Sequence, residues 1–137
     1  MNSRPRVSLK RKSDASPKMK MLLKLIKPII SSRGGNAKVI IFSQMKSSVA
    51  HCASFLKLHK IGYAKIIRGD PQDVQQRAVQ QWNVDDKTPC FLLHAGTAAA
   101  GLTLTAANHV FLLEPFSVAG EEAQALNRCH RIGQSRP

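Results

Sequence analysis

The chain has 137 residues, of which 43% are apolar and 21% are charged, and its formal net charge is +13. This size suits one globular domain, and this composition excludes collagen-like, disulfide-scaffold and fully disordered chains. The longest uncharged stretches, such as residues 88–110, contain Gly, Asn, His and Thr, which excludes a membrane-spanning helix. No apolar run of a signal peptide occurs near the N-terminus.

The positive charge is concentrated in the leading segment. Residues 1–38 carry eleven Lys or Arg and one acid, whereas residues 39–137 carry ten Lys or Arg and seven acids. We expect residues 1–17 to form a disordered basic tail and residues 18–137 to form the folded domain. A basic arm favours a polyanion partner such as nucleic acid, but a solubilising tail or a localisation signal explains the charge equally well.

The cysteines indicate free thiols rather than disulfides or a metal centre. The sequence contains three cysteines, an odd number, and none of them forms a Cys-x-x-Cys pair: they are Cys52, Cys90 and Cys129. This pattern is typical of a protein in a reducing compartment. The histidines do not combine with them at zinc spacing, so no metal site is expected.

From Lys18 onward, helical and strand patterns alternate. An amphipathic helix is expected from residue 18, ended or kinked near Pro28, and a turn follows at residues 31–36. Buried strands are expected at residues 38–43, 63–67, 90–93 and 109–113. Further helices are expected at residues 49–61, capped by Gly62, from residue 70 with Pro71 in the first turn, and at residues 120–129.

This alternation predicts an α/β fold, with a parallel sheet and helices on both faces. Ligands of such sheets bind at the carboxyl ends of the strands. The loops to inspect therefore follow Phe42, Ile67, Leu93 and Leu113.

Two of these loops carry groups suited to phosphate. Ser43 and Gln44 follow the first strand, where they can bind phosphate oxygens, although ordinary helix capping by Ser47 or Ser48 is the simpler explanation of this serine-rich loop. Small residues predominate at positions 94–105, where another chain or a phosphate could approach the backbone closely. The sequence contains no Gly-x4-Gly-Lys-Ser/Thr loop and no Asp-Glu pair after a strand, so the usual phosphate-binding lysine and magnesium carboxylate are missing.

A third candidate lies near the C-terminus. Gln124, Arg128 and Arg131 fall on one face of the expected last helix, and two guanidinium groups beside an amide suit bidentate phosphate capture. A solvated basic helix end, favoured by the helix dipole, is the alternative.

The segments "GLTLTAANHVFLLEP" and "EEAQALNRCHRIGQ" closely resemble motifs V and VI of the Swi/Snf-type helicase-like ATPases. "KVIIFSQ" is similar to their motif IV, and "GYAKIIRGDPQDVQQR" is similar to the segment that follows it. The resemblance covers residues 18–137 and implies the second of two RecA-like lobes, which explains the missing P-loop. The features Glu114-Pro115 and Glu-Glu-Ala-Gln are similar to the branch that also carries RING ubiquitin-ligase modules.

The resemblance implies a lobe of an ATP-dependent translocase on double-stranded DNA that remodels chromatin or serves DNA repair in the nucleus. ATP would bind between this lobe and a first RecA-like lobe that holds Mg²⁺, and partners would include nucleosomes or ubiquitin-pathway proteins, but no membrane. This chain alone would be inactive. The alternative is a non-catalytic lobe that binds DNA or chromatin without ATP turnover.

Site roles carry over from the matching motif positions. Arg131 matches the arginine finger, Arg128 its supporting arginine, and both are expected to be catalytic. The residues expected near nucleotide are Gln124, Gly101 and Thr103, and those expected near DNA are Ser43, Gln44, Thr97 and Arg77.

This sequence departs from the family at several polar positions. His94-Ala95-Gly96-Thr97-Ala98-Ala99 replaces the usual Ser-Thr-Arg-Ala-Gly-Gly. Thr103 and Asn108 replace an Asn and an Asp, and Gly69-Asp70 replaces the usual Asp-Gly. These changes affect expected contacts with DNA and ATP more than they affect the fold.

Overall fold

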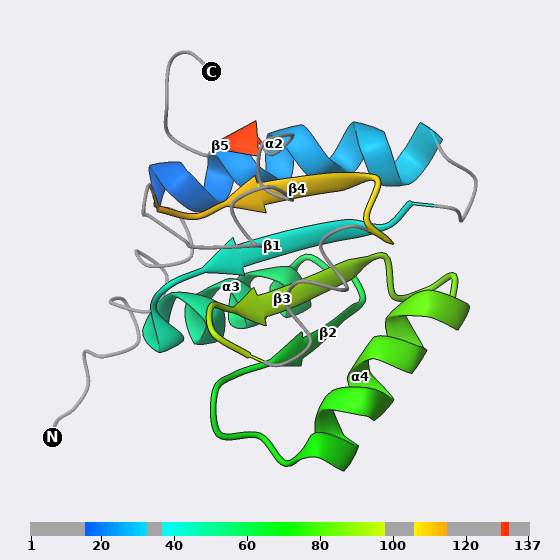
Figure 1. Ribbon diagram of the computed structural model, residues 1–137. Helices are drawn as coiled ribbons and strands as arrows, with labels where there is room; N and C mark the ends of the chain where they lie inside the picture. Colours follow the sequence, from blue (N-terminus) through cyan, green and yellow to red (C-terminus); the bar gives the residue numbers. More distant parts are fainter. Residues whose placement is uncertain (1–15, 33–36, 98–105, 115–129, 132–137) are drawn as a thin grey trace, which may run out of the picture.

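Five parallel strands form one sheet in the computed structural model, which describes residues 16–32, 37–97, 106–114 and 130–131. Their spatial order is β2-β3-β1-β4-β5, and β1 lies at the centre with β3 and β4 on either side (Figure 1). The strands are β1 (Val39–Ser43), β2 (Tyr63–Ile66), β3 (Cys90–His94), β4 (His109–Leu112) and β5 (His130–Arg131).

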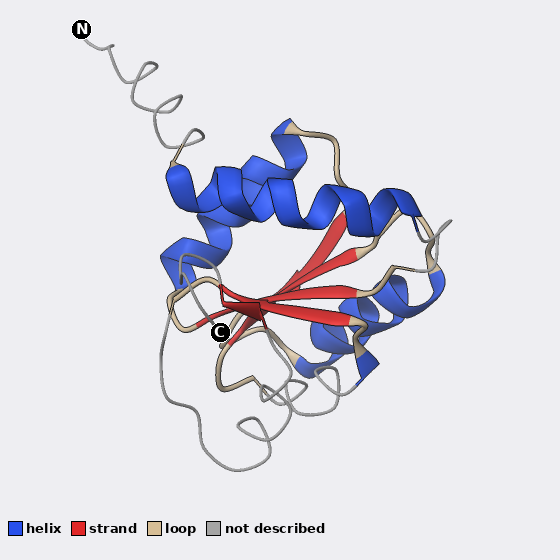
Figure 2. Cartoon of the chain, turned by 90° about the horizontal axis from the view of Figure 1, so that it is seen from above, coloured by secondary structure: helices blue, strands red, loops and turns tan. Residues whose placement is uncertain are grey.

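Helices cover both faces of this sheet. Those in the described residues are α2 (Pro17–Ser32), α3 (Lys46–Leu58) and α4 (Gln72–Val84). The chain passes over β3 from β1 to β2 through α3 and then returns to β3 through α4. Because both crossovers are right-handed, this reversal of direction places the two helices on opposite faces. Figure 2 shows α2 and α3 above the sheet and α4 below it, which confirms the predicted α/β fold.

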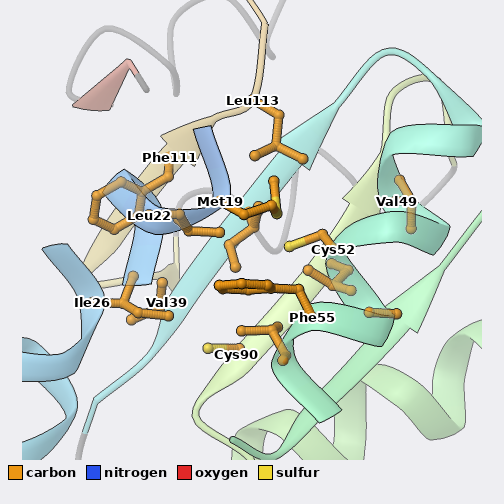
Figure 3. Packing of buried hydrophobic residues seen from close by; sticks show 14 of the residues in the cluster. Met19, Leu22, Ile26, Val39, Val49, Cys52, Phe55, Cys90, Phe111 and Leu113 are labelled. Carbon is orange, nitrogen blue, oxygen red and sulfur yellow. The ribbon is translucent and has the colours of Figure 1, made fainter. Parts of the chain in front are cut away.

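The alternation of side chains along β1 divides the core in two. Val39 and Ile41 point to the face covered by α2 and α3, and Ile40 and Phe42 point to the face covered by α4. All five residues of β1 are buried, as expected for a central parallel strand. On the first face, α2 packs Met19, Leu22 and Ile26, and α3 packs Val49, Cys52 and Phe55, against the strands (Figure 3).

A single tryptophan anchors the opposite face. Trp82 of α4 is buried, its ring centroid lies 5.2 Å from that of Phe91 in β3, and its indole N–H donates to the carbonyl oxygen of Pro89 over 3.1 Å. The aromatic pair and the satisfied indole fix α4 against the sheet.

The helix ends differ in detail from the sequence-based expectations. The α2 helix does not end at Pro28 but continues to Ser32, and Ile29 and Ile30 beyond the proline pack against the core. The N-cap of α3 is Met45, which makes no side-chain capping bond, so the expected capping by Ser47 or Ser48 is wrong.

The predicted capping role of Gly62 is also wrong. The α3 helix ends at Leu58, and Lys60 adopts the left-handed conformation with φ 59°. Gly62 is required for a different reason: a Cβ atom there would overlap the backbone carbonyl of Lys87. The expected last helix, residues 120–129, lies outside the described residues, as does nearly all of the predicted tail.

Candidate functional site at the carboxyl edge of the sheet

The end of β1 is joined to the end of β4 by one carboxylate. Ser43 is the fully buried last residue of β1, and its Oγ donates a hydrogen bond to Glu114 Oε2 over 2.8 Å. The backbone N–H of Gln44 donates to Glu114 Oε1 over 3.0 Å. Because the strands are parallel, both partners lie at the carboxyl edge, and Glu114 holds the loop after β1 in place.

A buried histidine joins two further loops to this edge. His94, at the end of β3, is only 5% exposed, and its Nδ1 accepts a hydrogen bond from the backbone N–H of Arg68 over 3.0 Å. Burial lowers the pKa of His94, and the positive charges of Arg68 and Lys46 lower it further. A hydrogen bond with the Gln44 backbone and the charge of Glu114 act in the opposite direction. The imidazole is therefore neutral near pH 7.

Arg68 lies across the turn that follows β3. Its Nε donates to the carbonyl oxygen of Ala95 over 3.1 Å, while the side chain remains exposed. Gly96 has φ +86°, and a Cβ atom there would lie 3.3 Å from Arg68 Nε. Glycine thus permits both the left-handed turn and the close approach of the guanidinium.

Three of the four residues expected to contact DNA lie at this edge. Gln44 is exposed there, Ser43 is buried beneath it, and Thr97 follows β3. Thr97 is buried, and its Oγ1 has no hydrogen-bond partner among the described residues. Arg77 does not belong to this group: it lies on α4, 72% exposed, with its guanidinium 3.6 Å from the Asp73 carboxylate.

The expected nucleotide and catalytic residues are less fully defined. Gln124, Gly101, Thr103 and Arg128 lie outside the described residues. Arg131 belongs to β5, which pairs with β4 so that Arg131 is opposite Leu112, instead of lying on the expected helix face. The backbone of residues 130–131 therefore runs beside the strand that leads to Glu114.

The polar network formed by Glu114, His94 and Arg68 was not predicted from the sequence. Each lies at or just after the carboxyl end of a strand, which is the signal that could have found them. Within the described residues no cluster of three His, Cys, Asp or Glu side chains could hold a metal ion, and no helix has the length and apolar character to cross a membrane.

Comparison with known proteins identifies the family. The sequence matches the helicase conserved C-terminal domain over residues 17–133. It is 35% identical over 100 residues to the DNA repair protein rad8 of Schizosaccharomyces pombe, covering 73% of this chain and 9% of that protein. It is 31% identical over 119 residues to Helicase swr1 of the same yeast, covering 87% of this chain and 9% of that protein. The chain therefore spans about a tenth of the length of these relatives.

Solved structures agree with the sequence matches. The C-terminal part of the Fun30 ATPase domain has a TM-score of 0.70 and 26% identity, over 90% of this chain and 39% of that one. The SWI2/SNF2 ATPase C-terminal domain of Sulfolobus solfataricus has the same fold, with a TM-score of 0.65 and 15% identity over 85% of this chain and 48% of that one. The chain belongs to the helicase conserved C-terminal domain family and is a second RecA-like lobe of the Swi/Snf type.

Proposed function

We propose that this chain is the second ATPase lobe of an ATP-dependent translocase on double-stranded DNA that acts in chromatin remodelling or DNA repair in the nucleus. The observation that carries this proposal is the arrangement of the carboxyl edge, where the loop after β1 lies between the loop after β3 and the β4–β5 pair. At this edge, where ligands of parallel sheets bind, Gln44 is exposed and Thr97 is buried. Nucleosomes and ubiquitin-pathway proteins are the proposed partners of the whole protein.

The chemistry of this edge fits phosphate groups. Thr97 Oγ1 is a buried polar atom that has no hydrogen-bond partner among the described residues, and the exposed side chain of Arg68 lies against Gly96, the residue before Thr97. Neutral hydroxyl and amide groups can form hydrogen bonds with the phosphate oxygens of a DNA backbone, and these contacts do not read the bases. We assign Gln44 and Thr97 to the DNA backbone, with Arg77 as a more distant contact. Ser43, which is buried and bonded to Glu114, would hold Gln44 in place for that contact.

For ATP, the proposed contacts come from the segments around motifs V and VI. Gln124, Gly101 and Thr103 would line the nucleotide, and Arg128 would hold a phosphate. Arg131 would neutralise the charge that develops on the γ-phosphoryl group. Mg²⁺ would be held by a first RecA-like lobe, since this sequence offers no P-loop lysine and no Asp-Glu pair.

The decisive experiment measures ATP hydrolysis by two proteins. The 137-residue chain alone should show no turnover, because its sequence lacks the P-loop lysine and the magnesium carboxylate that position the β- and γ-phosphates. In a two-lobe protein that carries this chain as its second lobe, Arg131→Ala should lower kcat by roughly 10³-fold or more while Lys57→Ala, on the exposed surface of α3, leaves it unchanged. Turnover by the isolated chain, or a near-normal kcat for the Arg131 variant, would contradict the assignment.

The alternative is a lobe that binds DNA or chromatin without turnover, and the loss of the usual polar residues between His94 and Ala99 favours it. A measurement of DNA binding distinguishes the two functions only when ATP hydrolysis is measured as well. Both predict weak, sequence-independent binding, whose association constant falls with salt so that its logarithm is linear in the logarithm of salt concentration. A two-lobe protein that binds DNA normally but never hydrolyses ATP would establish the alternative.

The basic tail has its own test. The α2 helix begins at Pro17, with the Ser16 hydroxyl accepting the backbone N–H of Met19 over 3.2 Å, so a deletion should stop at residue 15. Removing residues 1–15 takes away five cations and one acid. If the tail binds DNA, the salt slope should flatten by about 0.9 for each phosphate that the shortened chain no longer neutralises. Parallel salt titrations of the two proteins would show that the tail serves import or solubility instead.

A further inference from the structure

The outer face of α2 combines positive charge with exposed apolar side chains. Four lysines lie on its exposed surface, together with Met21 and Leu25, which are 44% and 40% exposed. The opposite side of the helix is fully used in the core, where Met19, Leu22 and Ile26 are buried. The lysines are Lys18, Lys20, Lys24 and Lys27.

These side chains form two parallel strips along the helix. With about 3.6 residues per turn, Met21 and Leu25 lie one above the other, and exposed Pro28 continues their line. Lys20 and Lys24 occupy the adjacent line on one side, so an apolar strip runs beside a cationic strip. Such a pair of strips is the complement of a helix with an apolar seam flanked by acidic positions.

Among the described residues, no acidic side chain pairs with the lysines of this face. The sequence of α2 contains no acidic residue. In the part of the chain that the structure describes, the one ion pair is Asp73–Arg77 on α4, which covers the opposite face of the sheet (Figure 2). A second copy of the chain would bring another charge of +13 and would be repelled.

We propose that this face of α2 is a docking surface for an acidic amphipathic helix of another protein. Met21 and Leu25 would be covered by the apolar seam of that helix, and the lysines would pair with carboxylates along its flank. DNA would satisfy the lysines but leave both apolar side chains in water, so a protein partner accounts for more of the surface. This inference does not rest on the ATPase function proposed above.

The test uses the full chain and a synthetic helical peptide as the probe. The peptide carries Leu at positions i, i+4 and i+7, with Glu on both flanks, and fluorescence anisotropy measures its binding at three salt concentrations. Two control peptides replace Leu by Gln or Glu by Lys. The exposed pair Lys57 and Leu58, on α3, supplies matched control variants, because Leu58 is 57% exposed beside a lysine.

We expect the acidic peptide to bind and both control peptides to fail. The double variant Met21→Gln/Leu25→Gln should weaken binding about tenfold, since two side chains lose partial burial in the interface. The variant Lys20→Gln/Lys24→Gln should weaken binding and flatten its salt dependence. Leu58→Gln and Lys57→Gln should change neither, and all variants should keep the thermal midpoint of the wild type.

Three results would overturn the proposal. The first is no binding of the acidic peptide at low salt. The second is equal weakening in the α3 control variants, which would mean nonspecific attraction to a basic protein. The third is binding of duplex DNA that depends on Lys20 and Lys24 while peptide binding does not, which would assign this face to nucleic acid.

Discussion

Removing the Glu114 carboxylate should destabilise the lobe by about 2 kcal/mol. Each hydrogen bond to a charged group contributes about 1.5–3 kcal/mol when it is removed without replacement. For two reasons, the combined effect of removing both hydrogen bonds is smaller here than the sum of two such contributions. Glu114 is half-buried, so water reaches part of the site, and the Ser43 hydroxyl can turn to the Met45 carbonyl oxygen, 3.1 Å away. The backbone N–H of Gln44 has no second acceptor among the described residues.

The measurement is urea unfolding followed by the fluorescence of Trp82, the single tryptophan, which is buried between α4 and the sheet. Glu114→Ala should lose about 2 kcal/mol, and Glu114→Gln, which keeps one acceptor oxygen, about 1 kcal/mol. Asp86→Ala, on an exposed turn, is the matched control and should stay within about 0.5 kcal/mol of the wild type. If Glu114→Ala matched that control, the carboxylate would not hold the β1 and β4 loops together.

Three further outcomes follow from burial and packing. Because the pKa of His94 is lowered in the folded lobe, the unfolded chain binds a proton there more tightly. The free energy of unfolding should therefore fall as the pH drops through 6.5 and below. In urea titrations from pH 7.5 to 5, His94→Gln should flatten this dependence. Burial raises the pKa of Cys90 to about 12 and also raises that of Cys52. Iodoacetamide at pH 7.5 should therefore alkylate both thiols only in urea, as measured by mass spectrometry. Alkylation of either thiol in the folded protein would contradict its burial. Gly62→Ala should lower the free energy of unfolding by about 3 kcal/mol, because the new Cβ atom would overlap the Lys87 carbonyl. Gly69→Ala, whose Cβ atom would lie in open space at φ +100°, should lower it by about 1 kcal/mol. Equal losses would contradict the close contact between Gly62 and Lys87.

The strands were predicted well because burial on both faces leaves a strong local signal. The run from Val39 to Ser43 and the run from Cys90 are continuous apolar segments, and both match their strands to within a residue. The alternation of elements then limits the topology, because right-handed crossovers leave few alternatives.

Helix ends and close approaches were predicted poorly because their causes are not local. Gly62 resembles a helix cap by position, but its role depends on Lys87 in a loop that precedes another strand. The continuation of α2 past Pro28 depends on the packing of Ile29 and Ile30 against the sheet, which compensates for the missing backbone donor.

In the candidate functional site, too, locally determined features were predicted and nonlocal contacts were not. Ser43 and Gln44 were expected at the carboxyl edge from the order of elements, and the structure places them there. Their partner Glu114 lies 71 positions after Ser43, and no spacing rule connects two loops so far apart. His94 was noted only as a departure from the family pattern, although its burial and its two backbone partners make it a joint between loops.

The central position of β1 has a consequence for how the chain is made. During synthesis β1 leaves the ribosome before β3 and β4, its two neighbours in the finished sheet. Until Cys90 and His109 have been added, the segment Val39–Ser43 has two open edges and an apolar surface. Such a segment pairs readily with other nascent chains, so this lobe should depend on chaperones during translation more than a fold whose strands pair in the order of synthesis.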